Sequence, residues 1–92
     1  MWTVMQLVPN TDNVLVGKQR KPRAYLAINH PAATCEDAYT KQAEINDEVG
    51  RPGTTRVEFD GGNSFGIAGQ PGNAEYVAMV RSRQAARDAA SA

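Results

Sequence analysis

The sequence is poor in the side chains that most enzyme and metal sites need. It has one cysteine, Cys35, and one histidine, His30. A single cysteine cannot close an internal disulfide, and secreted domains of this size usually need several, so we expect a reducing, cytoplasmic setting. Because a second cysteine, a second histidine and a calcium-type spacing of carboxylates are all missing, the sequence predicts no metal site and no cofactor.

Two further absences narrow the class of protein. No stretch approaches the roughly 20 apolar residues of a membrane span, and the first residues lack the basic region and cleavage site of a signal peptide. We therefore expect a complete, untargeted chain with no membrane partner. Ten basic and ten acidic residues give a formal net charge of zero. Any binding to nucleic acid must then come from a local basic patch, because the surface as a whole carries no positive excess.

The length and the apolar pattern predict one domain over residues 1–92, since a second core would leave each half too small to fold without staples. Residues 2–8 are apolar on both alternating faces, which is typical of an interior strand covered on both sides. Residues 14–16 predict a short second strand, and residues 24–29 a third that pairs back against it. The basic segment 17–23 would then form the hairpin tip.

A helix is predicted to begin after Thr34 and to end at Gly50 and the Arg-Pro-Gly that follows it. Its outer face is acidic. Its inner stripe is mostly apolar but includes two amides, Gln42 and Asn46. The amides either bond to the backbone of their own chain or line an interface with a second copy, and the pattern favours neither alternative. The whole inner stripe is Cys35, Ala38, Tyr39, Gln42, Ile45, Asn46 and Val49.

Residues 54–68 predict a hairpin with a three-residue loop, which pairs Phe59 with Phe65 and Val57 with Ile67. A second helix follows Asn73, and it buries Tyr76, Met79 and Val80 in its first turns. Its alanine-rich tail, residues 85–92, is predicted to fray or to need a partner. The predicted fold is therefore α+β, with a small antiparallel sheet of four to five strands and two helices in the order β(β)βαββα, both helices packing on one face.

Few residues qualify for chemistry. A Cys/His nucleophile pair needs direct contact and a third orienting group, and nothing in the sequence demands that His30 and Cys35 meet. We interpret Cys35 as a small buried side chain and His30 as a loop residue. The glycines Gly66, Gly69 and Gly72 precede a helix, as in phosphate-binding loops, but no lysine follows them, so a flexible connection is favoured. We expect a protein that is not an enzyme and has no catalytic residues.

Charge is segregated, and this defines the candidate binding residues. Basic partner-binding candidates occupy the predicted hairpin tip and the second helix: Lys18, Arg20, Lys21, Arg23, Arg81, Arg83 and Arg87. Acidic candidates occupy the outer face of the first helix: Glu36, Asp37, Glu44, Asp47 and Glu48. Each group could dock on a surface of opposite sign or simply face water.

The leading hypothesis is a small non-enzymatic protein that occupies a surface of a protein partner. Inhibitors and adaptors encoded by phages and other mobile elements often have this size and no active site, although this is an analogy of size alone. The alternative is a nucleic-acid-binding regulator that uses the basic tip and the arginines of the second helix. A second alternative is a small-ligand binder whose site is shared between the protomers of a homodimer or larger homo-oligomer.

Overall fold

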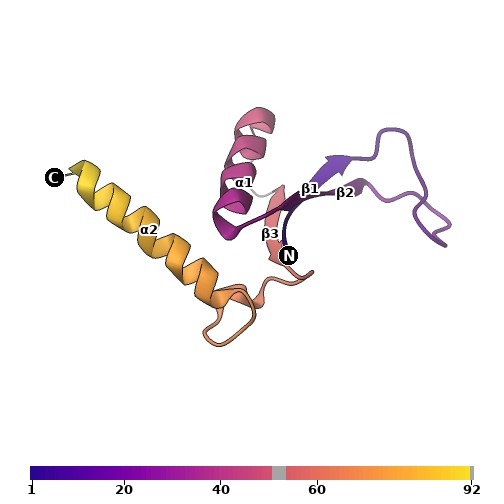
Figure 1. Ribbon diagram of the computed structural model, residues 1–92. Coiled ribbons are helices and arrows are strands. Elements are labelled where there is room, and N and C mark those ends of the chain that lie inside the picture. The colour runs from indigo at the N-terminus through magenta and orange to yellow at the C-terminus, as the bar shows by residue number, and fades with distance from the viewer. Residues whose placement is uncertain (51–53, 92) are drawn as a thin grey trace.

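The computed structural model describes residues 1–50 and 54–91, and Figure 1 shows their arrangement. Three strands form an antiparallel sheet in the order β2-β1-β3. The elements are β1 (Trp2–Pro9), β2 (Tyr25–Ala32), α1 (Cys35–Val49), β3 (Thr55–Phe59), the 3₁₀ helix η1 (Ser64–Gly66) and α2 (Asn73–Ser91). The predicted α+β class with two helices is confirmed. The predicted four to five strands and their order are not, since the described residues form three.

β1 is the central strand, paired with β2 on one edge and with β3 on the other. Its alternate residues Trp2 and Val4 are buried on the face that α1 covers. Leu7 belongs to the opposite face and is 41% exposed. The prediction that both faces of this strand are covered is therefore wrong, because α1 covers one face, and α2 packs mainly on η1 and α1 and meets β1 at Trp2.

The limits of α1 follow from two capping interactions that the sequence predicts. The hydroxyl of Thr34 accepts a hydrogen bond from the backbone N–H of Asp37, at 3.1 Å, and so satisfies one of the free donors of the first turn. Gly50 has a φ of 64° and its N–H donates to the carbonyl of Asn46, which is the left-handed end that favours glycine. Residues 51–53 of the predicted stop signal lie outside the described residues.

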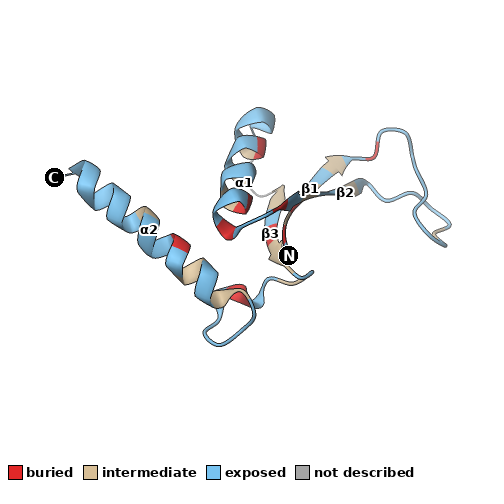
Figure 2. Ribbon diagram, viewed as in Figure 1, coloured by how far each residue is buried: buried red, intermediate tan, exposed pale blue. Residues whose placement is uncertain are grey.

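The core lies where the start of β1 meets α1, η1 and the first turns of α2, as the buried residues in Figure 2 show. Aromatic rings dominate it. The ring centroid of Trp2 is 4.8 Å from that of Phe59 and 5.0 Å from that of Phe65. Phe65 in turn lies 5.2 Å from Tyr76 of α2. These tilted and edge-on contacts link four elements that are far apart in the sequence.

The predicted hairpin over residues 54–68 is wrong in its second half. Asp60 and Gly61 both have positive φ, 51° and 81°, and a tight turn closes between the backbones of Phe59 and Gly62. An Asp-Gly pair favours such a two-residue turn. The chain then enters η1, which turns Phe65 into the core, while Ile67 remains 61% exposed. Phe65 is therefore buried by a helical turn and not by strand pairing with Phe59.

The sequence favours a flexible connection around Gly72. In the structure, close packing at Gly72 fixes the link from η1 to α2. Its φ is 84°, and a Cβ there would lie 2.9 Å from the ring of Phe59 and 3.2 Å from Cβ of Phe65. A side chain at this position would displace the aromatic core, so a glycine is needed for space as well as for conformation.

α2 extends away from the body of the molecule (Figure 1). Of the three apolar side chains predicted to be buried in its first turns, Met79 is buried and Tyr76 is half-buried, but Val80 is 42% exposed. The predicted tail is helical and exposed as far as Ser91, and Ala92 lies outside the described residues. The prediction that both helices pack on one face of the sheet thus holds for α1 only.

Candidate binding surfaces

The most prominent surface is the β1–β2 loop, residues 10–24, which projects beyond the sheet (Figure 1). The sequence predicts a strand at residues 14–16, but β2 pairs with β1 instead and these residues belong to the loop. The loop has a defined base. Asn10 is buried, its side-chain N–H donates to the carbonyls of Val14 and Arg23, both at 2.9 Å, and its side-chain oxygen accepts from the N–H of Val14.

The loop exposes apolar and basic side chains next to each other. Val14, Leu15 and Val16 are 45%, 53% and 52% exposed. The four predicted cations of the tip follow within the same loop and are also exposed, and Asp12 is the only acid between β1 and β2. The aliphatic run and the cations together form one amphipathic surface, which we call the loop surface: Val14, Leu15, Val16, Lys18, Arg20, Lys21 and Arg23.

The arginines of α2 do not extend the loop surface. α2 and the β1–β2 loop lie at opposite ends of a molecule whose longest dimension is 55 Å (Figure 1). Arg83 is also engaged, since its guanidinium donates to both carboxylate oxygens of Glu36 at 2.9–3.1 Å. Arg81 and Arg87 are exposed. The seven predicted basic candidates therefore form two separate groups.

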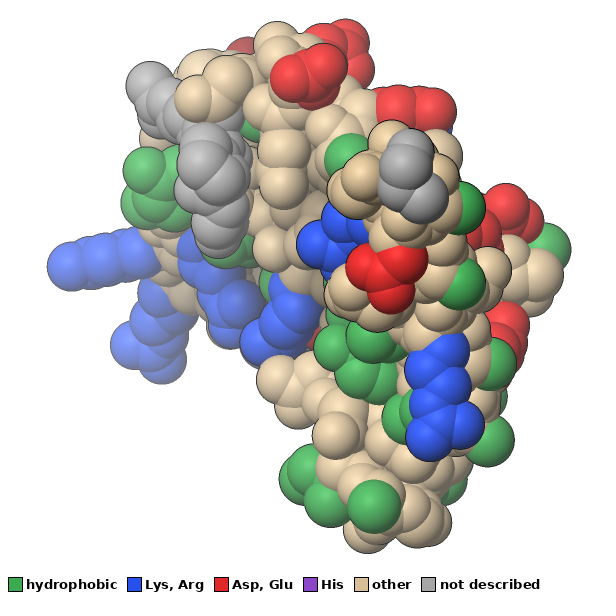
Figure 3. All heavy atoms as spheres, turned by 90° about the vertical axis from the view of Figure 1, so that its left-hand side faces the viewer, with side chains coloured by type: hydrophobic (Ala, Val, Ile, Leu, Met, Phe, Trp, Pro, Cys, Tyr) green, Lys and Arg blue, Asp and Glu red, His purple; other side chains and the backbone are tan. Residues whose placement is uncertain are grey.

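The acidic candidates remain on the outer face of α1. Glu36 forms an ion pair with Arg83. The other four acidic candidates are exposed: Asp37, Glu44, Asp47 and Glu48. Figure 3 shows acidic side chains at the top of the molecule and basic ones at the lower left, with charges of both signs side by side at the centre and on the right. At Glu36 the acidic face of α1 meets the basic side chain of Arg83.

Gln42 and Asn46, the candidates for an oligomer interface, bond within the chain. The amide of Gln42 donates to the carbonyl of Thr55 at 3.5 Å, and the side-chain oxygen of Asn46 accepts from the hydroxyl of Thr55 at 2.8 Å. Both amides thus join α1 to the start of β3. Their presence in an apolar stripe needs no second subunit to account for it.

His30 and Cys35 have separate environments. The interpretation of His30 as a loop residue is wrong, because it lies in β2 opposite Val4, with Nε2 2.9 Å from the side-chain oxygen of Gln6. Cys35 is fully buried at the start of α1, and burial, followed by the charges of Glu75 and Glu36, raises the pKa of its thiol to about 11. A thiol with that pKa is protonated near neutral pH and is a poor nucleophile.

Glu75, at the first turn of α2, joins the elements of the core, and the sequence gives little sign of its role. One carboxylate oxygen accepts from the indole N–H of Trp2 at 2.7 Å. The other accepts from the backbone N–H of Cys35 at 2.9 Å. A carboxylate at a helix N-terminus is favourable because it satisfies a free donor and faces the positive end of the dipole. Its only signal in the sequence is an acidic residue shortly after a helix start.

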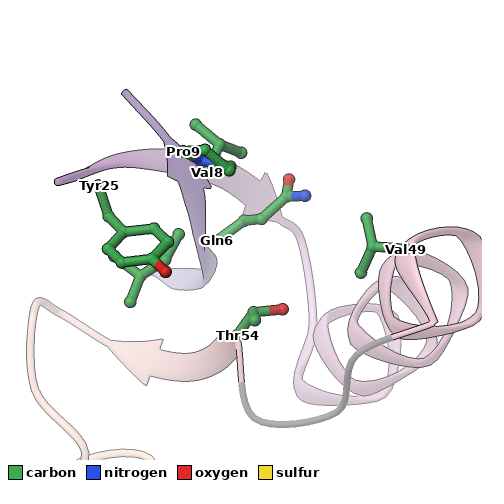
Figure 4. Close-up of a pocket in the computed structure, with 7 residues that line it drawn as sticks. Gln6, Val8, Pro9, Tyr25, Val49 and Thr54 are labelled. Atoms are coloured by element: carbon green, nitrogen blue, oxygen red, sulfur yellow. The ribbon is translucent and has the colours of Figure 1, made fainter. Parts of the chain in front are cut away.

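A hollow of about 320 Å³ lies beside the free end of β1, where Tyr25 and Val49 stand on opposite sides of Gln6 and Thr54 (Figure 4). Leu7, Val8 and Pro9 complete the lining. Most of these side chains are apolar, and Tyr25 carries the one ionisable group among them. The hollow can hold an apolar group, and the described residues that line it offer no acid–base pair.

The described residues contain no group of three or more His, Cys, Asp or Glu side chains that could hold a metal ion. No helix in the same residues has the length and apolar character needed to cross a membrane. Comparisons with protein-family models, with curated proteins and with solved structures find no match to this chain.

Proposed function

We propose that the chain is a non-enzymatic binding protein that acts by occupying a surface of a protein partner, with the loop surface as its main contact region. The observation that carries this proposal is three consecutive aliphatic side chains, about half exposed, beside four cations. Contiguous exposed apolar groups are unfavourable in water and often mark interaction sites.

The composition of the loop surface suggests the character of its partner. Protein interfaces have an apolar centre that excludes water and a polar rim. Here Val14, Leu15 and Val16 supply the apolar centre, and the cations supply the rim. The complementary surface is therefore an acidic one with an apolar depression. Because Asn10 fixes the base of the loop, less conformational entropy is lost on binding than for a disordered segment.

The state of the two reactive side chains supports a role without catalysis. Cys35 is buried with a raised pKa, and the imidazole of His30 is engaged with Gln6. Neither side chain lines the hollow beside Tyr25.

Binding to nucleic acid is the second candidate, and the four cations on a projecting arm favour it. Such an arm can neutralise phosphates, and exposed aliphatic side chains can insert between base steps in the minor groove. Two features weigh against it. The α2 arginines lie at the other end of the molecule (Figure 1). The loop also lacks the aromatic side chains on which single-stranded bases stack.

The test is capture of partners from lysate on immobilised chain, with and without nuclease, using two loop variants. One replaces Val14, Leu15 and Val16 with serine. The other reverses the four loop cations to glutamate. The control for the first is Ile67→Ser, an aliphatic side chain that is 61% exposed elsewhere. The control for the second is the pair Arg81→Glu and Arg87→Glu on α2.

We expect a captured protein that resists nuclease, is lost with both loop variants and is retained by both controls. Moderate salt should weaken this binding without abolishing it, because the centre of the contact is apolar. Recovery of nucleic acid alone, with a log affinity that falls linearly with log salt, would instead establish the second candidate. Capture that is unchanged in both loop variants would refute the role of the loop surface.

A further inference from the structure

The outer edge of β2 has a row of backbone groups with no strand beside it in the part of the chain that the structure describes. β2 is an edge strand, and the N–H of Asn10 donates to the carbonyl of Ala24 where β2 begins. Hydrogen-bonded pairs recur at every second residue of an antiparallel ladder. The even-numbered residues of β2 therefore bond to β1, and the backbone N–H and C=O groups of Tyr25, Ala27 and Asn29 point away from the sheet.

This edge lacks the protection that exposed edges usually have. Residues 24–34 contain no Lys, Arg, Asp or Glu, so no charged side chain repels an incoming strand. Pro31, which cannot donate, is the single blocking residue and lies near the end of the strand. The edge formed by β3 differs, because it carries Arg56 and Glu58 and its last residue, Phe59, already bonds to Gly62. A further strand would add to β2 and not to β3.

We propose that β2 pairs antiparallel with β2 of a second copy of this chain, around a two-fold axis at Ala27, to form one six-stranded sheet. The register follows from the free groups. With Ala27 opposite Ala27 of the second copy, Tyr25 lies opposite Asn29, and all three outward donors on each chain find acceptors. If the pairing shifts by two residues toward Pro31, this proline joins the ladder. Because it has no N–H to donate, hydrogen bonds are lost.

The same register covers exposed apolar side chains. Leu26 and Ile28 lie on the face that carries α1, but near the end of the sheet that α1 leaves open, and Ile28 is 44% exposed. With the axis at Ala27, Leu26 of each copy lies opposite Ile28 of the other. Four aliphatic side chains then pack across the junction, in the closer, non-hydrogen-bonded type of pair.

Charge complementarity favours a second copy over an unrelated strand. Beyond the paired residues, Arg23 lies opposite Pro31 of the second copy, and the basic β1–β2 loop continues beside the segment that leads into α1. That helix begins with Glu36, which is paired with Arg83, and with Asp37, both in an exposed first turn. The two-fold axis brings a basic segment and an acidic segment together twice, once at each end of the junction.

Sedimentation velocity over a concentration series tests the association. We expect the mass to rise from 9.9 kDa toward twice that value as the concentration increases. Ala27→Lys places two like charges opposite each other at the axis and should weaken dimerisation at least tenfold. Ala43→Lys, the same change on the exposed face of α1, should dimerise as the unmodified chain does. Unchanged circular dichroism in both variants shows that the fold persists.

The register is tested by oxidation of single-cysteine additions. Residues in a hydrogen-bonded pair have Cα atoms about 5.5 Å apart, within the roughly 4.4–6.8 Å range of disulfides. Ala27→Cys should therefore cross-link to its own copy. Two cysteines at Tyr25→Cys would lie four positions apart along the strand, roughly 13 Å, and should not. The native Cys35 is buried and does not compete.

A chain that stays monomeric at about millimolar concentration, equal dimerisation of Ala27→Lys, or cross-linking through position 25 instead of 27 would each overturn the proposal. So would protection of the Tyr25, Ala27 and Asn29 amides from hydrogen exchange by a foreign peptide and not by higher chain concentration, since another strand would then occupy the edge. The proposal does not rest on the proposed function, because the test variants leave the loop surface intact.

Discussion

The two ends of the sheet differ in how well they are covered. Where β1 begins, Trp2 and Val4 are enclosed by α1, η1 and the first turns of α2. At the other end, Val8 and Leu26 are only half-buried. The first end contains the aromatic cluster and Glu75. The second contains the β1–β2 loop and the free edge of β2. The difference teaches that the first end holds the fold together, while the second carries the surfaces that we propose for binding. Substitutions at the two ends should therefore have different effects.

The largest effect is expected at Glu75. Glu75→Ala removes the acceptor of the Trp2 indole and of the Cys35 backbone N–H. Hydrogen bonds to charged groups contribute about 1.5–3 kcal/mol each, and water can replace part of this at Glu75, which is exposed. We therefore expect the free energy of unfolding to fall by roughly 2–3 kcal/mol. Urea denaturation followed by circular dichroism measures this. Glu44→Gln, on the exposed face of α1, is the control and should change stability little. If stability falls no more for Glu75→Ala than for the control, the enclosed end does not depend on Glu75 for its stability.

A smaller and more local effect is expected at Asn10. Asn10→Ala removes three side-chain hydrogen bonds that fix the base of the loop. Because these groups gain water when the loop opens, we expect a cost of about 1–2 kcal/mol. Hydrogen exchange should accelerate at Val14, and Trp2 fluorescence should stay native. The control is Asn63→Ala, an exposed asparagine without a side-chain cap bond. Simultaneous loss of the tryptophan signal would mean that the two ends unfold as one unit.

Alkaline pH should weaken the enclosed end. Burial is the largest cause that raises the pKa of Cys35 from 9.0 to about 11 and that of Tyr39 from 10.0 to about 12. Above the unfolded pKa the unfolded chain releases protons that the folded chain keeps, so stability is complete below about pH 9 and is lost as pH rises toward 12. The midpoint of urea unfolding, measured from pH 8 to 11, should fall steadily. For Cys35→Ala the fall should be shallower between pH 9 and 11, and an identical slope would contradict this assignment.

The smallest effect is expected at Arg83, in the exposed part of α2. Arg83→Ala removes the ion pair with Glu36 and the contact of the guanidinium with the ring of Tyr39, 5.9 Å from its centroid. Both partners of the ion pair are partly exposed, so screening by water limits the cost to about 0.2–1 kcal/mol. A double-mutant cycle with Glu36→Gln measures the coupling, with Arg87→Ala as the exposed control. A coupling of zero would mean that this ion pair does not help to hold α2, which would then depend on its aromatic contacts and on Glu75.

Local capping and composition predicted α1 closely. Thr34 and Gly50 act within a few residues of themselves, so a sequence pattern is sufficient to locate them. The region after β3 was harder to predict. Phe65 and Ile67 alternate as strand residues do, but the Asp60–Gly61 turn closes early and the aromatic core draws Phe65 into η1. Tertiary packing overrides a period-two pattern in such a short segment.

The residues that organise the candidate surfaces were predicted least well. No pattern in the sequence indicates the roles of Asn10 and Glu75. Each acts on backbone groups that are distant in the sequence or set by loop geometry, and neither leaves a spacing pattern. The cations of the tip were predicted from their density alone. Their separation from the α2 arginines depends on the direction of α2, which a helical pattern does not specify.

The position of the one tryptophan gives the molecule its own spectroscopic reporter. Trp2 is 2% exposed, touches two phenylalanine rings and donates to Glu75. Its emission therefore senses whether the carboxy-terminal helix is docked, and it should not respond to a ligand that touches only the loop. An affinity tag or fluorophore is accordingly best placed at the carboxy terminus, since the amino terminus pairs with Asp60 beside this ring.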